Sequence, residues 1–552
     1  MGTALGARVP RSAHECRARR TSAGRRGRGC DDGGVSTPPA PVVVPELVAA
    51  LRADLTTAAY AVEHVEDLLG PVAAGALDRG EALPALRATA PTAATGSDPA
   101  AVLTRCFVLG VPVPVRALAA ALPGLGVEGA ALLGLVEAAG RGPDDEVRAR
   151  VDLRPYAATD GAGEAAWWVV SDLGELATGG ALRTDHVLGV GGASVTLAQA
   201  TVRDPRRRVL DLGTGCGVQA LHASRHAEHV VATDLSTRAL AFAAFTTALA
   251  GLGPDRVELR AGSMLEPVAG DTFDLVVSNP PFVITPRRAD VPAYDYRDGG
   301  RAGDDLVRDL VTGVGAVLAP GGVAQMLANW EVRDGEEWHE RIGAWVGASG
   351  LDAWVVQRDE QDPAQYAETW IRDGGTTPAD RAAWTARYGA WLDDLASRDV
   401  ASVGFGIVTL RRPLAGRPTL RRLESQTGSL RQPLGPVLAA GLAAHDAVTA
   451  LSDDELAARH LTVAPDVTEE RYLEPGAVDP RVVLLRQGGG FGRTVQAGTA
   501  LAAFVGACDG ELTAGQIVGA LGALLDVPAA DVAGDVLPSV RGLLTDGLLT
   551  LA

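Results

Sequence analysis

The chain has 552 residues, 47% of them hydrophobic, which is enough for several domains with buried cores. All 50 basic residues are arginine, which excludes Schiff-base chemistry on a lysine and the lysine of a phosphate-binding loop. The formal charge is −18, and so acidic a body approaches a nucleic-acid backbone only where arginines cluster, as at 287–288, 411–412 and 421–422.

The first 34 residues hold eight arginines against three acidic residues, with no apolar segment suited to a signal peptide or a membrane span. We interpret residues 1–34 as a disordered, Arg-rich tail. Whether the tail belongs to the expressed protein is open, because Val35 is an alternative start. Two of the five cysteines lie in it, so we expect no disulfide framework and a cytoplasmic location without a membrane partner.

The next part of the chain, 35–180, is predicted to be mostly helical. Apolar residues recur at helical spacing in 45–69 and 102–139, and the alternating runs 146–153 and 166–170 predict a hairpin. Helices followed by a hairpin favour a winged-helix-like module. Such modules bind nucleic acid or protein, and many only pack, so the shape assigns no function.

A glycine-rich turn follows the next apolar run. Residues 207–220 read Arg-Arg-Val-Leu-Asp-Leu-Gly-Thr-Gly-Cys-Gly-Val-Gln-Ala, which predicts a strand, a turn and a helix from Val218. The glycines let the backbone approach a ligand closely, and the helix points its first amides at a polar or anionic group. The spacing Gly-x-Gly-x-Gly is not the Gly-x-Gly-x-x-Gly of a dinucleotide site, which argues against NAD.

A second apolar run, 229–233, ends in Asp234, 23 positions after Asp211. This is close to the interval at which a doubly wound fold places an acid on ribose hydroxyl groups. A third run lies at 256–260, and a fourth ends in Asn-Pro-Pro-Phe. Strand, glycine turn, helix, strand and terminal acid in this order predict an α/β domain with a parallel sheet.

Asn279 begins the Asn-Pro-Pro-Phe string and is one of only two asparagines in the chain. A planar amine or amide nitrogen is a poor nucleophile, because its lone pair is delocalised. The Asn279 side-chain oxygen and the Pro280 carbonyl are expected to accept its two N–H groups and turn the lone pair towards an electrophile. Pro280 and Pro281 stiffen the turn, and Phe282 offers a flat face for stacking. The alternative is a proline-rich turn after a strand.

Together these residues resemble a class I S-adenosylmethionine-dependent methyltransferase with an Asn-Pro-Pro-(Phe/Tyr) signature, a group that includes base N-methyltransferases and HemK-type glutamine N5-methyltransferases of release factors. The resemblance covers about residues 181–412 and implies a Rossmann-like, seven-stranded domain that binds S-adenosyl-L-methionine. It places the ribose on Asp234 and the adenine near Leu235, Ser263 and Met264, although the family usually has an acid where this chain has Ser263. The methionine part would lie against Asp211, Gly213, Thr214, Gly215, Cys216 and Gly217, next to Asn279.

The chain after Phe282 bears on which nitrogen is methylated. A Gly-Gly-x-x-Gly loop follows the signature in the glutamine N5-methyltransferases, and residues 299–303 match it. Guanine methyltransferases often have His after Asn-Pro-Pro-Phe, where this chain has Val283. The resemblance therefore favours a glutamine amide in a protein of the translation apparatus. An exocyclic amine of an RNA or DNA base is the main alternative, and a small-molecule acceptor or a noncatalytic cofactor-binding scaffold stays open.

His222 and His226 fall one helical turn apart, near His229, without further ligands at zinc-binding spacing. We interpret them as part of a solvated helix face and expect no metal site. Cys216 is expected to pack in the cofactor loop, where a small residue suffices.

The sheet is expected to continue with strands at 323–328, 351–357 and 403–410. Between the last two lies an insertion, about 362–399, that is rich in Trp and Tyr although the chain is only 4% aromatic. We expect these rings to bury the insertion's own helices, with a substrate lid as the alternative. Residues 182–198 are a candidate cover for the cofactor. Residues 413–552 are predicted as a second winged-helix-like module with a strand at 482–485 and helices near 499–508, 513–525 and 531–547.

Overall fold

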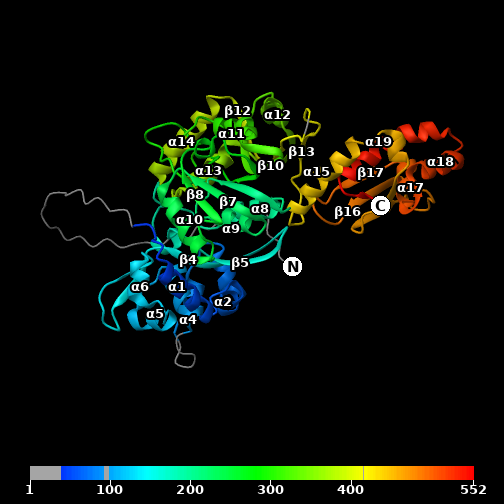
Figure 1. Cartoon of the computed structure of the whole chain (residues 1–552). Helices are drawn as coiled ribbons and strands as arrows, with labels where there is room; N and C mark the ends of the chain where they lie inside the picture. The colour runs from blue at the N-terminus through cyan, green and yellow to red at the C-terminus, as the bar shows by residue number, and fades with distance from the viewer. Residues whose placement is uncertain (1–38, 92–97, 415) are drawn as a thin grey trace. The chain divides into compact units, whose positions relative to one another are not determined.

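The computed structural model describes residues 39–91, 98–414 and 416–552, so the predicted tail at 1–34 lies outside the described residues. The chain forms two compact units that divide between Asp152 and Leu153 (Figure 1). The domain boundary that we predicted near residue 180 falls inside the second unit.

The first unit packs helices beside a small antiparallel sheet with strand order β1-β3-β2. Leu51, Leu55 and Leu118 are fully buried, because periodic apolar residues turn one face of each helix inward. Its last elements follow one another as in a winged helix: a helix, a strand, two helices and two paired strands. The elements are α1 (Pro45–Thr57), α2 (Val62–Leu77), α3 (Leu83–Ala88), α4 (Pro99–Leu103), η1 (Thr104–Val108), β1 (Val113–Pro114), α5 (Val115–Ala121), α6 (Gly126–Leu132), β2 (Val136–Ala138) and β3 (Glu146–Ala149).

The predicted pairing of the runs 146–153 and 166–170 is only partly right. Residues 146–149 form β3, which pairs with β1 and β2, because the Gly- and Pro-rich residues 139–145 turn the chain back between β2 and β3. Asp152 and Leu153 begin β4 (Asp152–Asp160), which forms a separate hairpin with β5 (Gly163–Ser171), the strand that contains 166–170.

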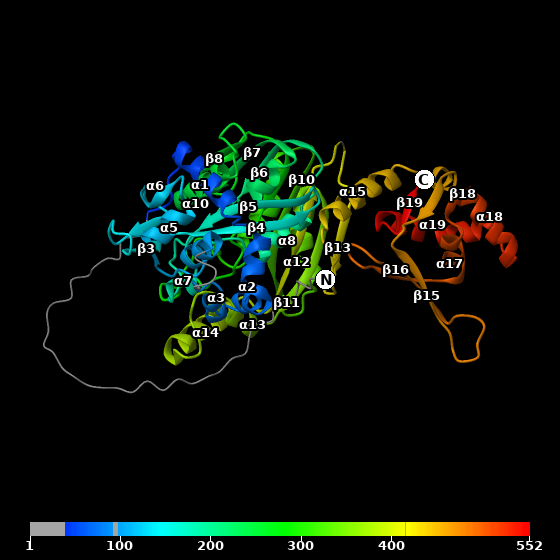
Figure 2. The ribbon, with the colours of Figure 1, turned by 90° about the horizontal axis from the view of Figure 1, so that it is seen from below.

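The second unit is built on one large sheet with strand order β13-β11-β12-β10-β9-β6-β7-β8. The strands from β8 to β10 are parallel, whereas β12 runs antiparallel to both of its neighbours. Figure 2 shows β8, β7, β6 and β10 following one another across this sheet. The strands are β6 (Arg206–Leu212), β7 (Ala227–Asp234), β8 (Val257–Ala261), β9 (Phe273–Ser278), β10 (Leu318–Arg333), β11 (Asp352–Gln361), β12 (Val400–Arg411) and β13 (Arg421–Ser425).

This is the Rossmann-like α/β fold that the sequence predicts, with one strand more than the seven expected. The eighth strand, β13, lies parallel to β11 at the edge of the sheet. Asp352 accepts the backbone N–H groups of Thr419 and Leu420 (2.7 and 2.9 Å) and so holds the chain on that edge. The sheet therefore extends past residue 412, where we predicted the domain to end.

Helices cover both faces of the sheet. One core contains α11 and α12, with Leu310 and Ile342 fully buried, and the other contains α8, α9 and α15, with Leu197 and Ala220 fully buried. Both cores are mostly aliphatic because parallel strands are buried on both faces. These elements are α7 (Glu175–Thr178), α8 (Gly192–Ala200), α9 (Val218–Ser224), α10 (Thr237–Leu249), η2 (Glu266–Val268), α11 (Asp305–Gly313), η3 (Val314–Val317), α12 (Trp338–Ser349) and α15 (Gly435–Thr449).

The predicted insertion holds α13 (Pro363–Asp373) and α14 (Arg381–Ala396) between β11 and β12. Its aromatic residues bury the insertion's own helices as expected, with Tyr366 in ring contact with Trp370 and Trp391. The same core also takes in the residues that follow Asn-Pro-Pro-Phe.

The C-terminal residues form two small sheets, with orders β18-β14-β19 and β15-β16-β17, and pack Phe504, Ile517 and Val536 in a core of their own. The predicted strand at 482–485 and the three predicted helices coincide with β16, α17, α18 and α19. The elements are α16 (Asp453–Ala457), β14 (His460–Val463), β15 (Val467–Tyr472), β16 (Val482–Gln487), β17 (Thr494–Ala497), α17 (Thr499–Gly506), β18 (Asp509–Thr513), α18 (Ala514–Leu525), α19 (Ala529–Thr545) and β19 (Leu549–Leu551).

Within 39–91, 98–414 and 416–552, no single helix has the length and apolarity to cross a bilayer, although the bent pair α5 and α6 meets that test jointly. In the same residues no cluster of three His, Cys, Asp or Glu side chains is arranged to hold a metal ion.

Candidate active site

The residues singled out in the sequence meet at the edge of the sheet where the parallel strands end. Leu212 of β6 pairs with Ser278 of β9, and the Ser278 hydroxyl donates to the Leu212 carbonyl (2.9 Å). Gly213 and Asn279 therefore leave the sheet from neighbouring positions. β7 ends at Asp234 on the other side of β6. In open α/β sheets, ligands bind at this carboxyl edge.

The glycine turn borders open space. Gly213, Gly215 and Gly217 have φ of 75°, 54° and 88°, a conformation that residues with a side chain adopt only at a cost. A Cβ on Gly213 or Gly215 would meet no atom within 4 Å, whereas one on Gly217 would lie 3.1 Å from Ala243 of α10. The first two glycines thus leave room for a ligand, and the third allows α9 to pack closely on α10.

Two acidic side chains flank this turn. Asp211 is completely buried, its Oδ2 accepts the Thr214 hydroxyl (2.6 Å), and its Oδ1 has no partner among the described residues. Burial raises the pKa of Asp211 to about 7 and also raises the pKa of Asp234. The Asp234 oxygens accept the N–H groups of Gly215 and Ser236 (2.9 Å each) and keep further lone pairs for ligand hydroxyl groups.

Asn279 presents an unsatisfied acceptor. Its side-chain oxygen is buried and accepts no hydrogen bond from any described residue, which is costly unless a ligand or a water donates to it. The Pro280 carbonyl accepts the Phe282 N–H (2.7 Å), so only its second lone pair can serve a substrate. Pro281 and Phe282 are half-buried, and Phe282 forms an isolated antiparallel bridge with Asp298.

The residues that the resemblance assigns to adenine lie around the ends of β7 and β8. Leu235 is 74% exposed. The Gly262 N–H donates to the Asp234 carbonyl (3.0 Å), which holds the turn containing Ser263 and Met264 beside β7. Met264 has φ of 49°, a strained conformation of the kind found at functional sites.

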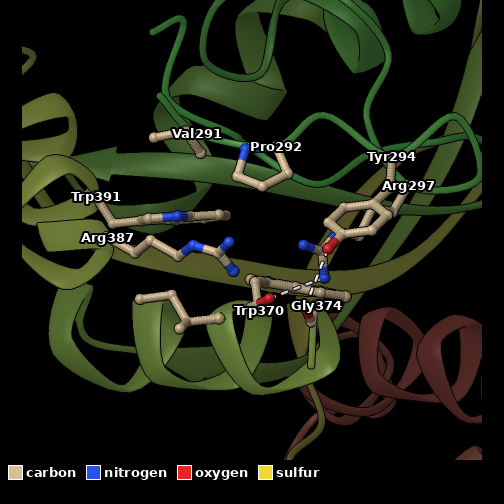
Figure 3. Close-up of a pocket in the computed structure, with 9 residues that line it drawn as sticks. Val291, Pro292, Tyr294, Arg297, Trp370, Gly374, Arg387 and Trp391 are labelled. Carbon is tan, nitrogen blue, oxygen red and sulfur yellow. Dashed lines mark hydrogen bonds between the residues drawn. The ribbon is translucent and has the colours of Figure 1, made fainter. Parts of the chain in front are cut away.

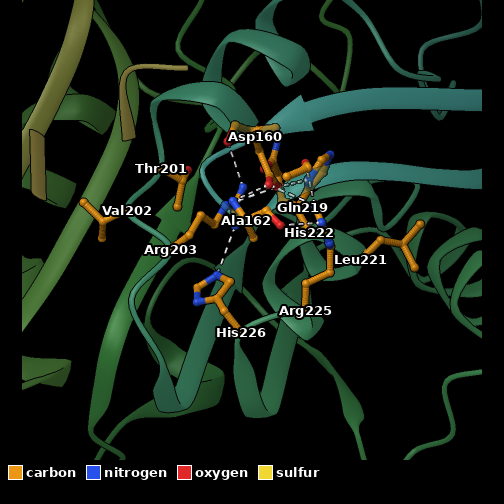
Figure 4. Close-up of polar contacts among 12 residues, drawn as sticks. Asp160, Ala162, Thr201, Val202, Arg203, Gln219, Leu221, His222, Arg225 and His226 are labelled. Carbon is orange, nitrogen blue, oxygen red and sulfur yellow. Dashed lines mark hydrogen bonds and ion pairs between the residues drawn. The ribbon is translucent and has the colours of Figure 1, made fainter. Parts of the chain in front are cut away.

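The interpretation of the histidines as a solvated helix face is wrong for His222. This side chain is fully buried, with Nδ1 2.6 Å from Asp160 Oδ2 and Nε2 2.9 Å from the Tyr156 hydroxyl (Figure 4). Arg225 and Arg203 pair with the same Asp160 (2.8 and 3.4 Å). This cluster of Tyr156, Asp160, Arg203, His222 and Arg225, here called the hairpin cluster, ties α9 to the hairpin of β4 and β5.

The pKa values in the hairpin cluster follow from burial and charge. Burial lowers the pKa of His222 more than its hydrogen bond to Asp160 raises it. Burial opposes ionisation of Asp160, but the His222 bond and the Arg203 charge lower its pKa to about 2. His222 is therefore neutral and Asp160 charged near pH 7. α9 leads directly from the glycine turn, so this cluster supports the turn from behind.

Part of the segment 182–198 is anchored close to the site. Asp172, just after β5, accepts the Val187 N–H (2.9 Å) and pairs with Arg238 of α10. The Thr184 carbonyl accepts the Asp295 N–H (2.8 Å), which links this segment to the chain after Phe282. The Asp295 charge adds to the burial that raises the pKa of Asp234.

These features fit S-adenosyl-L-methionine, the cofactor that the resemblance implies. Open space beside Gly213 and Gly215 suits a ligand backbone, Asp234 suits a diol, and Leu235 offers an exposed apolar surface. The unsatisfied Asn279 oxygen points to a second ligand with an N–H donor. One edge of the sheet thus holds the elements of a cofactor site and an acceptor site.

Comparison with known proteins agrees with this geometry. Residues 189–334 match the family model described as methyltransferase small domain. Residues 57–150 match a domain of unknown function, DUF7059.

Similar proteins carry related names. The chain is 41% identical over 128 residues to the release factor glutamine methyltransferase of Deinococcus radiodurans, covering 22% of this chain and 45% of that protein. It is 36% identical over 133 residues to the ribosomal protein uL3 glutamine methyltransferase of Bordetella pertussis, covering 22% and 44%. The chain thus spans about half the length of the curated relatives it matches. A solved T. thermophilus 16S rRNA N2 G1207 methyltransferase is 21% identical, covering 40% of this chain and 55% of that one, at a TM-score of 0.25.

The sequence pointed to the glycine turn, Asp234 and Asn279, and the structure brings them to one edge. The sequence did not point to the hairpin cluster. A signal was present, because residues 218–223, Val-Gln-Ala-Leu-His-Ala, leave hardly any polar face on which a histidine could be solvated.

Proposed function

We propose that the second unit transfers methyl from S-adenosyl-L-methionine to a planar nitrogen, and that the acceptor is the side-chain amide of a protein glutamine. The observation that carries the proposal is the buried Asn279 oxygen, which has no partner among the described residues. Asn279 follows Ser278 of β9, and Ser278 pairs with Leu212, the residue before the glycine turn. An amide N–H of the substrate would satisfy this oxygen.

The chain's own residues orient both molecules. Gly213 and Gly215 leave room for the methionine part, Asp234 accepts from the ribose hydroxyls, and Leu235, Ser263 and Met264 border the adenine. The bound cofactor supplies a methyl group on a sulfonium, an electrophile that needs no titrating nucleophile from the protein. Asn279 and Pro280 accept the two N–H groups of the acceptor, and Phe282 packs against its plane. Transfer then depends on alignment.

Two observations favour a protein glutamine as the acceptor. The relatives are named for glutamine methylation of a release factor and of ribosomal protein uL3. Residues 299–303 match the loop that follows the signature in such enzymes. The partner would then be a cytoplasmic translation factor or ribosomal protein. An exocyclic base amine is the second candidate, favoured by the arginine pairs at 287–288, 411–412 and 421–422.

The test incubates the purified chain with methyl-labelled cofactor and a cell extract, then treats the product with protease or nuclease. Label released by protease and resistant to nuclease supports a protein acceptor. Complete enzymatic digestion that yields labelled N5-methylglutamine, and acid hydrolysis that releases the label as methylamine, support the amide. Label removed by nuclease alone would favour the base. Cofactor binding without transfer to any fraction would favour the noncatalytic scaffold.

Asn279→Ala identifies the acceptor side of the site. We expect cofactor affinity within about twofold of wild type and transfer lower by roughly 100- to 1,000-fold, since an orienting group is lost. Ser278→Ala is the matched control, because it removes a side-chain hydrogen bond one residue away and leaves the acceptor oxygen. Full activity of Asn279→Ala would place the acceptor elsewhere.

A further inference from the structure

The backbone after Asn-Pro-Pro-Phe is held by the aromatic insertion. The Val283 N–H donates to the Arg297 carbonyl (2.9 Å), and the Ile284 N–H donates to the Tyr366 hydroxyl (2.9 Å). Val283, Ile284 and Tyr366 are buried in one core. Two successive amides behind the proposed acceptor residues are thus fixed by groups distant in sequence.

Arg297 joins this backbone to α13. Its guanidinium is buried and donates to the Trp370 carbonyl (2.9 Å; Figure 3). It also pairs with Asp373 at the end of α13. It lies over the Tyr294 ring at 4.5 Å and the Trp370 ring at 5.7 Å, where a cation is attracted to aromatic faces. Lysine could not reproduce this combination of a planar stack and two directed hydrogen bonds.

Tyr366 forms the second connection. Its side chain is completely buried on α13, and its hydroxyl accepts from both Ile284 N–H and Asn329 Nδ2 (2.8 Å). Asn329 lies in β10, the strand next to β9. The hydroxyl therefore locks the segment after Phe282 to the sheet and to the insertion together.

The space between Arg297 and the insertion is filled. The cavity bordered by Val291, Arg297, Trp370 and Trp391 measures about 10 Å³, room for no more than one water molecule. A lid over a substrate would leave a ligand-sized cavity here. The contacts instead suit a permanent support.

We propose that Arg297 and Tyr366 are positioning residues for the methyl acceptor, acting through α13 of the insertion to fix the backbone that carries Asn279 and Phe282. This inference rests on the proposed function. Neither residue is expected to touch the cofactor, so their loss should impair transfer and spare cofactor binding.

The test compares Arg297→Lys and Tyr366→Phe with Tyr388→Phe. Tyr388 also lies in the insertion, but its hydroxyl donates to Glu368 (3.3 Å) and not to the acceptor segment. Hydrogen exchange should be about tenfold faster at Ile284 in Tyr366→Phe, since the Ile284 N–H loses the hydroxyl that accepts it. Transfer of labelled methyl into extract protein should fall roughly 10- to 100-fold in both variants, as misplacement of about 1 Å can cause. Calorimetry should give unchanged cofactor affinity, and Tyr388→Phe should match wild type in all three measurements.

The outcomes separate this inference from the proposed function. A wild-type chain that transfers to no fraction contradicts the proposed function and removes the basis of the inference. A wild type that transfers, with Arg297→Lys and Tyr366→Phe equally active, overturns the inference alone. Unchanged exchange at Ile284 in Tyr366→Phe, or weaker cofactor binding together with slower transfer, also overturns it. Arg297→Lys retains the charge, and Tyr366→Phe removes only one oxygen, so each is expected to fold.

Discussion

The two sides of the candidate site are supported by different kinds of interaction. Behind the glycine turn lies the hairpin cluster, a largely buried arrangement of one carboxylate, two guanidinium groups, an imidazole and a phenol. Behind Asn279 lies an aromatic core on which Arg297 stacks. Breaking a buried ion pair leaves uncompensated charge, whereas an aromatic core loses contacts gradually. We therefore expect a single substitution behind the glycine turn to cost much stability, and a single substitution behind Asn279 to cost less.

The variant with the largest expected effect on this comparison is Asp160→Ala. It would strand Arg203, Arg225 and His222 without their shared acceptor, and we expect a loss of about 3–5 kcal/mol in the free energy of unfolding. Urea denaturation measures it. His229→Ala is the control, because His229 is half-buried at the surface and reaches Glu258 only at 3.4 Å. A loss below about 1 kcal/mol would mean that the hairpin cluster is dispensable.

Asp234→Ala separates cofactor binding from stability on the same side. We expect cofactor affinity to weaken by roughly 1–3 kcal/mol through lost charge-assisted hydrogen bonds, measured by calorimetry. Ser236→Ala is the control. It removes the Ser236 hydroxyl, which caps α10 by accepting the Ala239 N–H, and it leaves the Asp234 carboxylate in place. Equal affinity of the Asp234→Ala variant and wild type would contradict the ribose assignment.

Gly215→Ala and Gly335→Ala test whether the open space at the glycine turn is needed for cofactor binding. Both glycines have positive φ (54° and 79°) and no atom within 4 Å of an added Cβ, so both variants should lose about 1–2 kcal/mol of stability. Only Gly215 borders the proposed cofactor site. Cofactor affinity should fall in Gly215→Ala and stay unchanged in Gly335→Ala. An equal fall in both variants would mean that backbone strain, and not the loss of open space, weakens binding.

The smallest expected effect is a dependence of stability on pH. Burial and the Arg203 charge lower the pKa of His226 to about 4, and burial also lowers the pKa of His222. The unfolded histidines bind protons near pH 6.5 and the folded ones do not, so their contribution to stability is fully present above that pH and is lost as the pH decreases towards 4. The raised pKa of Asp211 acts with the opposite sign, so the test compares wild type with His226→Gln, which share Asp211. From pH 8 to 5 the urea midpoint of wild type should fall relative to that of His226→Gln, and a relative rise would contradict the sign.

The sequence was most informative where the pattern is local. Alternation of apolar runs with a glycine turn predicts the parallel strands and the carboxyl edge, because backbone conformation and register follow from neighbouring residues. Asn279 stood out chemically. The partners of His222 and Arg297 lie 62 and 76 residues away in the chain, at Asp160 and Asp373, so no spacing rule connects them. The eighth strand was also missed. Its position at the edge depends on the hydrogen bond between Asp352 and Thr419, which lie 67 residues apart in the chain.

That added strand bears on how the catalytic part can be produced alone. A fragment that stops at residue 412 would leave the backbone of β11 unpaired along one edge and remove Glu424, which accepts from the Trp354 indole (2.6 Å). Exposed edges of this kind recruit other chains and aggregate. A fragment built on the large sheet should therefore continue through β13 and also through α15, which packs in its core, to Thr449.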